Sequence, residues 1–188
     1  FIIQKNLGTF GDGGAVITNN DEMDQTIRKL RNHGSLKRSY HSPGFNSRLD
    51  DIHAGVLSAK LKHIDEWNDL RRKWAARYTA GLQEAENIVL PYEAPGYRHV
   101  YHLYVIETRR PEDRDKLLNF LIENGIDAKT HYPIAIHQQE GYPWDKSARI
   151  VGPLTNSERN AACCVSLPMY PELTEEEVDY VIAKVLEW

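Results

Sequence analysis

Residues 50 to 82 carry apolar side chains at helical spacing, and so long a helical stretch restricts the chain to folds that pack helices against a core. A helix is predicted to begin near Asp50, with one apolar stripe formed by Ile52, Val56, Leu57 and Leu61. A long helix follows it, with a continuous apolar face formed by Trp67, Leu70, Trp74, Ala75, Tyr78 and Leu82. Both tryptophans are therefore expected in the core.

Beyond these helices the pattern changes to short strands around one helix. Strands are predicted over residues 88–91 and 100–106, where β-branched and aromatic side chains gather. Pro111 suits the first position of a helix, which is predicted to end at Gly125 and to be followed by a strand over residues 126–131. This order of elements predicts a small α+β unit.

The C-terminal part then holds one irregular segment, one strand and one helix. Residues 132–156 contain scattered prolines and glycines, and a strand is predicted over residues 165–167. A final helix opens at Thr174, whose spacing to Glu177 is that of a capping box. We expect a boundary between the helical part and this sheet-containing part near residues 83–87.

The N-terminal part is predicted to contain a strand, a shorter helix and a loop. Residues 14–18 have strand character, and residues 21–31 carry apolar side chains at helical spacing. Gly34 suits the left-handed position beyond the end of that helix. Residues 35–48 show no periodicity, which indicates a loop long enough to reach a ligand or a partner subunit.

Lys5 is the candidate chemical centre of the chain. It follows the apolar residues 1–3, which we expect to be buried, and it precedes glycines within residues 8–14 that let the backbone approach a ligand closely. A lysine desolvated in this way loses proton affinity, and its neutral amine is a nucleophile toward carbonyl groups. From the residues alone, a solvated surface lysine beside a structural turn remains the open alternative.

A second candidate site lies where the first long helix begins. Asn46 and Arg48 shortly precede Asp50. A helix start offers unpaired backbone N–H groups that suit a phosphate or carboxylate, and an arginine can add a bidentate contact. The alternative is that Asp50 only caps the helix.

The composition excludes several classes of function. The chain has 188 residues, a net charge of -4 and a pI near 6.1, so nothing favours binding to nucleic acid or to an anionic membrane. No apolar run approaches the roughly 20 residues that span a bilayer, and a cytoplasmic location is the default expectation. The basic cluster at residues 71–73 is interpreted as a solvated face. The adjacent Cys163 and Cys164 are expected to be small buried residues, and no metal site is predicted.

Two runs near the N-terminus resemble a segment of a known family. Phe1-x-x-x-Lys5-Asn6-Leu7-Gly8 and Gly11-Asp12-Gly13-Gly14-Ala15-Val16 are similar to the cofactor-lysine segment of the DegT/DnrJ/EryC1/StrS sugar aminotransferases. The resemblance extends over nearly the whole chain. It implies part of an α/β, fold-type I pyridoxal-phosphate transferase, with residues 1–85 as the end of the large cofactor-binding domain with its connecting helices and residues 86–188 as the small C-terminal α+β domain. The part of such enzymes that precedes Phe1 is absent, so we expect a fragment.

The resemblance also implies roles for five residues. Lys5 would carry pyridoxal phosphate as a Schiff base and later move protons. Asn46 would reach across a homodimer interface to the cofactor phosphate of the other subunit, and Arg48 would lie near the sugar nucleotide. His131 and Tyr132 match a His-Tyr-Pro block and would hydrogen-bond the sugar or its diphosphate.

One position departs from the family pattern. Many members carry glutamine where this chain has His53, which leaves the polar contact at that position open.

The function implied is a pyridoxal-phosphate-dependent aminotransferase. It would convert a nucleotide-linked keto sugar, a 3-keto or related hexose, to an amino sugar with glutamate as donor. Relatives that dehydrate or deoxygenate sugars carry histidine at the lysine position, so Lys5 favours transamination. Two alternatives stay open: a non-catalytic regulatory or assembly homologue of the same fold, and an ordinary α+β binding domain without cofactor. The isolated chain is expected to be inactive and to bind the cofactor weakly.

Overall fold

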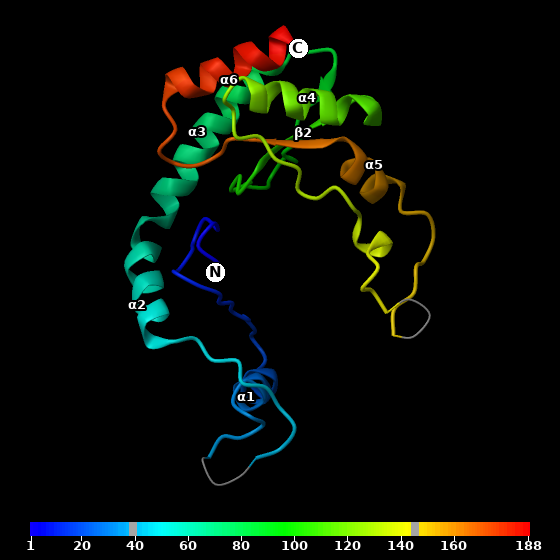
Figure 1. Cartoon of the computed structure of the whole chain (residues 1–188). Coiled ribbons are helices and arrows are strands. Elements are labelled where there is room, and N and C mark those ends of the chain that lie inside the picture. Colours follow the sequence, from blue (N-terminus) through cyan, green and yellow to red (C-terminus); the bar gives the residue numbers. More distant parts are fainter. Residues whose placement is uncertain (38–40, 144–146) are drawn as a thin grey trace. The chain divides into compact units, whose positions relative to one another are not determined.

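The computed structural model describes residues 1–37, 41–143 and 147–188. Contacts divide the chain into two compact units, an N-terminal unit of Phe1–Asp65 and a C-terminal unit of Glu66–Trp188. Figure 1 shows the elements of both units. Three residues of the predicted loop over 35–48 and three of the irregular segment over 132–156 lie outside the described residues. None of the described helices is both long and apolar enough to cross a membrane.

The N-terminal unit contains the predicted helix α1, Asp21–Leu30. Its N-cap is Asn20, whose side chain accepts a hydrogen bond from the Met23 N–H at 2.9 Å. Gly34 has φ +67°, which confirms the left-handed position predicted beyond the helix end. None of the ten residues of α1 is buried, so its apolar stripe lies at the surface of the chain.

The strand predicted over residues 14–18 is wrong. These residues are not part of any strand, and the side chains of Val16 and Ile17 are 67% and 94% exposed. A strand is held by hydrogen bonds to a neighbouring strand, and no part of the chain that the structure describes pairs with this segment.

The predicted helical stretch is confirmed. It consists of α2, Asp51–Lys60, the short 3₁₀ helix η1, Leu61–His63, and α3, Ile64–Leu82. Within α2 only Leu57 is buried, whereas Ile52 is 76% exposed and Leu61, just beyond the helix, is 57% exposed, so half of the expected stripe is uncovered. Within α3 the predicted apolar face is buried from Trp74 onward.

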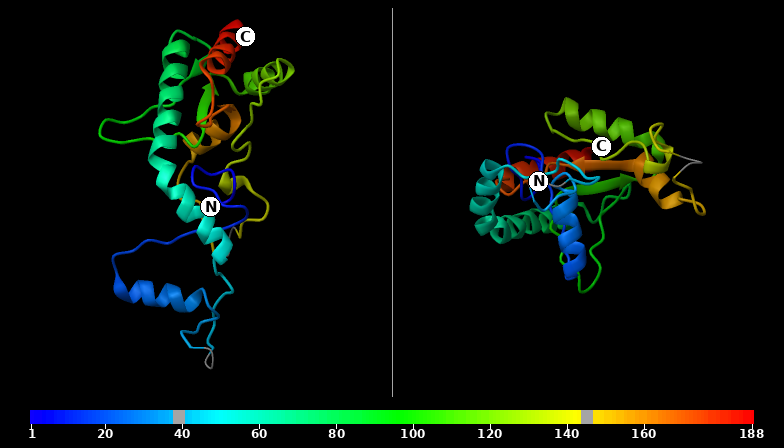
Figure 2. Two further views of the ribbon diagram at one scale, coloured as in Figure 1. Left: turned by 90° about the vertical axis from the view of Figure 1, so that its left-hand side faces the viewer. Right: turned by 90° about the horizontal axis from the view of Figure 1, so that it is seen from below.

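The C-terminal unit is built on a three-stranded antiparallel sheet in the order β1-β2-β3. Its strands are β1 (Ile88–Val89), β2 (Tyr104–Thr108) and β3 (Cys164–Leu167). The helices of this unit after α3 are α4 (Pro111–Glu123), η2 (Ile136–Gln138), α5 (Thr155–Cys163) and α6 (Glu175–Glu187). Helix α4 packs along β2 and β3, and the segment between β1 and β2 projects away from the sheet (Figure 2).

Two of the predicted strands differ in the structure. The strand expected over residues 100–106 begins only at Tyr104, because Tyr101 has φ +41° and interrupts the extended backbone before it. The strand expected over residues 126–131 is reduced to one bridge between Lys129 and Ser166.

One core joins α3, the sheet, α4 and α6. The rings of Tyr78 on α3 and Tyr104 on β2 lie 5.0 Å apart, and burial raises the pKa of Tyr104 to about 12.

Cys163 and Cys164 are both fully buried, as predicted. The interpretation of residues 71–73 as a solvated face is wrong for Arg71, which is only 7% exposed.

The boundary predicted near residues 83–87 lies between the helical part and the sheet-containing part of the chain. The compact units separate after Asp65 instead, because α3 contributes Trp74, Tyr78 and Leu82 to the core of the C-terminal unit. The assignment of residues 1–85 to a large domain stays a prediction.

Candidate functional site

Lys5 lies in a tight turn at the start of the N-terminal unit. Its backbone N–H donates a hydrogen bond to the Ile2 carbonyl oxygen at 2.9 Å. Gly8 passes so close to this turn that a Cβ there would lie 2.5 Å from the Ile3 carbonyl oxygen. Any other residue at position 8 would therefore displace the backbone that carries Lys5.

The expected burial of residues 1–3 is wrong for Ile2 and Ile3, whereas Phe1 is half-buried. Ile2 and Ile3 are 39% and 56% exposed, and Lys5 itself is exposed. An apolar run predicts that a side chain can be buried but does not supply the surface that covers it, and the N-terminal unit leaves these two residues uncovered.

Asn46 and Arg48 lie in the segment that enters α2. A bridge between Asn32 and Asn46, together with the hydrogen bond from the Ser47 N–H to the Arg31 carbonyl at 2.9 Å, fixes the backbone of this segment after α1. The side chains of Asn46 and Arg48 are both exposed.

Asp50 occupies the N-cap position of α2, but its side chain makes no capping hydrogen bond. The alternative that Asp50 only caps the helix is therefore wrong, because its side chain does not bind the first turn of α2.

His131 and Tyr132 lie at one end of a pocket in the C-terminal unit. His131 Nδ1 is 2.8 Å from Ser166 Oγ on β3, and the two rings of His131 and Tyr132 meet edge to face at 5.4 Å. Tyr132 is 67% exposed, whereas Ser166 is buried. The strand β3 therefore fixes the histidine, while the tyrosine ring remains accessible.

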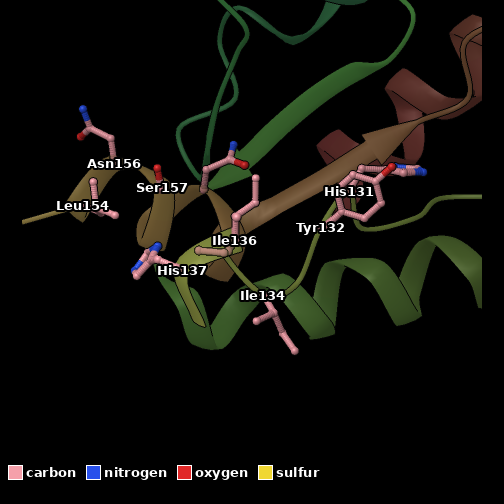
Figure 3. A pocket seen from close by; sticks show the side chains of 11 residues that line it. His131, Tyr132, Ile134, Ile136, His137, Leu154, Asn156 and Ser157 are labelled. Atoms are coloured by element: carbon pink, nitrogen blue, oxygen red, sulfur yellow. The ribbon is translucent and has the colours of Figure 1, made fainter. Parts of the chain in front are cut away.

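The pocket has a volume of about 580 Å³ and extends from this pair to η2 and the first turns of α5 (Figure 3). At its other end lie His137, Leu154, Asn156 and Ser157, with Ile134 and Ile136 between (Figure 3). His137 Nε2 is 2.9 Å from Glu158 Oε1. The described residues that line the pocket include no lysine, arginine, aspartate or glutamate, and its polar groups come from histidine, tyrosine, asparagine and serine side chains.

Sequence reasoning missed α5 and with it one wall of the pocket. The residues involved are Asn156, Ser157 and Asn160. A signal was present, because Thr155 is followed three positions later by Glu158, the spacing that marks helix starts. The structure places the N-cap one residue earlier, at Leu154.

The predicted site residues thus fall into two groups. Lys5, Asn46 and Arg48 belong to separate segments of the N-terminal unit, and His131 and Tyr132 lie together in the C-terminal unit. Among the residues that the structure describes, no group of three or more His, Cys, Asp or Glu side chains could hold a metal ion.

The match of this fold to a solved transferase and the match of the sequence to a family model define the class of this chain. It is part of a fold-type I, pyridoxal-phosphate-type transferase fold of the α/β class.

Comparison with known proteins identifies the family. The model of the DegT/DnrJ/EryC1/StrS aminotransferase family matches residues 1–186, and the chain belongs to this family. It is 44% identical to a pleiotropic regulatory protein of Geobacillus stearothermophilus, over 100% of this chain and 50% of that protein. It is 42% identical to the dTDP-3-amino-3,4,6-trideoxy-alpha-D-glucose transaminase of Streptomyces venezuelae, over 98% of this chain and 48% of that enzyme.

The fold is similar to that of a solved relative. The structure of DesV from S. venezuelae in complex with a ketimine intermediate superposes with a TM-score of 0.90 at 42% identity, covering 98% of this chain and 49% of that one. The chain therefore spans about half the length of the curated relatives it matches.

Proposed function

We propose that the protein containing this chain is a pyridoxal-phosphate-dependent aminotransferase that converts a nucleotide-linked keto sugar to an amino sugar. One observation carries the proposal: a chain that matches the family over residues 1–186 has a lysine, and not a histidine, in the turn where the resemblance implies the cofactor is bound. The transaminase relative from S. venezuelae supports the same reaction class.

The residues of this chain fit the cofactor. Lys5 offers a primary amine, which is the group that condenses with the aldehyde of pyridoxal phosphate. Asn46 offers an amide for the cofactor phosphate of the other subunit, and Arg48 offers a guanidinium for the sugar nucleotide; both side chains are exposed before the first turn of α2. Pyridoxal phosphate, when bound, supplies an electron sink for the substrate carbon. The Lys5 amine then serves as the base that moves a proton there.

The substrate is proposed to be a 3-keto or related hexose on a nucleotide carrier, with glutamate as amino donor. His131 and Tyr132 contact the sugar or its diphosphate in this proposal. Support comes from their common pocket and from the exposure of Tyr132, since loops and strand ends on a rigid scaffold commonly carry substrate-binding side chains.

A spectroscopic titration tests this function. Adding pyridoxal phosphate to the intact protein is expected to produce the absorbance band of lysine-bound cofactor, and glutamate is expected to bleach it as the amino group is transferred. A thermal-shift screen of nucleotide sugars would then identify the carrier. Absence of the band would favour a binding domain without cofactor. A band that glutamate leaves unchanged would favour a non-catalytic homologue.

A homodimer with shared sites is also proposed, with Asn46 of one subunit serving the Lys5 site of the other. An Asn46→Ala protein is expected to lose the cofactor more readily on dilution, because the phosphate loses an amide contact. Mixing Asn46→Ala subunits with Lys5→Ala subunits should restore about a quarter of wild-type activity, since half of randomly formed dimers carry one intact site. Activity assays after unfolding and mixed refolding measure this. No recovery would place both residues in one subunit's site.

A further inference from the structure

The last residue of α2 reaches the glycine-rich segment that follows Lys5. Lys60 Nζ donates a hydrogen bond of 2.8 Å to the Gly8 carbonyl oxygen, although the two residues are 52 positions apart in sequence. The same ammonium lies 6.0 Å from the centre of the Phe10 ring. A hydrogen bond from a charged donor is stronger than one between neutral groups, so this contact fixes the carbonyl of Gly8 more firmly than an ordinary loop contact.

Gly8 also touches the turn that carries Lys5. A Cβ on Gly8 would lie 2.8 Å from the Ile2 carbonyl oxygen, and that oxygen accepts the hydrogen bond from the Lys5 N–H. The backbone of Gly8 therefore lies between Lys60 on one side and the Lys5 turn on the other. A displacement of Gly8 would change the packing of the turn directly.

Helix α2 makes two further contacts with the same segment. Thr9 is fully buried, and its hydroxyl donates to the His53 carbonyl oxygen at 3.4 Å. The His53 ring lies against Gly11, where a Cβ would be 2.9 Å from its Cε1 atom. The histidine that departs from the family pattern thus packs on the glycine-rich segment, and α2 contacts it at residues 8, 9 and 11.

We propose that Lys60 is a positioning residue for Lys5: by binding the Gly8 carbonyl it holds the turn that presents the Lys5 amine. The proposal rests on the function proposed above for Lys5, but the contact itself can be measured without cofactor. Lys60 acts through Gly8 and does not touch the reacting atoms.

The first test is amide hydrogen exchange of the intact protein without pyridoxal phosphate. Lys60→Met removes the ammonium and keeps most of the apolar stem, so the amides of Lys5 and Thr9 are expected to exchange about tenfold faster. Lys62→Met is the matched control, since Lys62 is exposed on η1 and its replacement is expected to leave both amides unchanged. Unchanged exchange in Lys60→Met would overturn the proposal.

The second test is the rate at which the absorbance band of lysine-bound cofactor forms after pyridoxal phosphate is added. Lys60→Met is expected to slow it about tenfold, Lys60→Arg to restore most of the rate, and Lys62→Met to match wild type. Faster exchange with an unchanged rate would show a purely structural contact and would also overturn the proposal. A wild-type protein that forms no band contradicts the function proposed for Lys5, whatever Lys60 does. If Lys60→Met does not fold, Lys60→Gln, which keeps a shorter neutral donor, takes its place in both comparisons.

Discussion

Replacing Lys5 by alanine in the intact protein is expected to abolish the absorbance band of lysine-bound pyridoxal phosphate and to lower the transamination rate by at least about a thousandfold. The loss follows because the amine both holds the cofactor and moves the proton in the proposed reaction. Because Lys5 is exposed, the variant should melt at about the same temperature as the wild-type protein when both are measured without cofactor. An absorbance spectrum, a coupled assay of glutamate consumption and a thermal melt measure the three effects.

Two further variants distinguish the role of the Lys5 amine as a nucleophile from the role of its positive charge. Lys5→Arg keeps the positive charge but has no nucleophilic neutral amine at ordinary pH, so it is expected to be as inactive as Lys5→Ala. Lys62→Ala removes another exposed lysine and should keep both the band and the activity. A Lys5→Ala protein that retains the band and transaminates would refute the assignment of Lys5.

The features that the sequence predicted best are those that depend on neighbours within one helical turn. The capping box at Thr174 is present, with the Thr174 N–H donating to Glu177 Oε2 at 2.8 Å and the Glu177 N–H donating to Thr174 Oγ1 at 3.2 Å. Pro111 begins α4 as expected. Such signals involve residues that are three positions apart or fewer, so no tertiary contact is needed to read them.

The strands show why other elements could not be read in the same way. Tyr101 adopts φ +41° while its ring packs 6.1 Å from that of Tyr104, a conformation set by the core and not by residue type. Lys129 pairs with Ser166 through a single bridge. Strand pairing depends on partners distant in sequence, and β-branched residues alone do not identify them.

The candidate site was predictable in its residues but not in its surroundings. The motif around Lys5 identified the lysine, yet the exposure of Ile2 and Ile3 depends on what covers them. In the same way His131 was named from its His-Tyr-Pro block, whereas its partner Ser166 lies 35 positions away. The spacing of residues in a motif predicts which reactive side chains a chain carries. The tertiary fold decides which other groups cover and orient those side chains.

Arg71, which lies outside the candidate site, is another residue whose surroundings could not be predicted from the sequence. Its charged neighbours at 72 and 73 suggested a solvated face, but its guanidinium is buried on α3. Its Nη1 atom lies 2.8 Å from the Met169 carbonyl oxygen, 3.2 Å from that of Tyr101 and 3.4 Å from that of His102. Burial lowers the pKa of Arg71, the expected effect of desolvating a charged group. One side chain thus joins the segment before β2 to the segment after β3.

Arg71→Met is expected to lower the free energy of unfolding of the C-terminal unit by about 3 kcal/mol, because the methionine fills the apolar part of the space but leaves the three carbonyl groups without this donor. Removing a buried charge offsets part of that loss, since the guanidinium no longer has to be desolvated. Arg71→Lys should be intermediate, because a single ammonium cannot match the fork of a guanidinium.

Urea unfolding followed by tryptophan fluorescence measures the change, since Trp74 lies in the same core at 4% exposure. Arg98→Met is the matched control: Arg98 forms a surface ion pair with Asp69 at 2.5 Å, and pairs of this kind contribute little to stability. If Arg71→Met unfolds at the same urea concentration as Arg98→Met, the buried guanidinium does not hold the two segments together. The hydrogen bonds from Trp74 Nε1 to the Pro171 carbonyl oxygen and from the Tyr78 hydroxyl to the Pro168 carbonyl oxygen would then be the contacts that join α3 to the segment after β3.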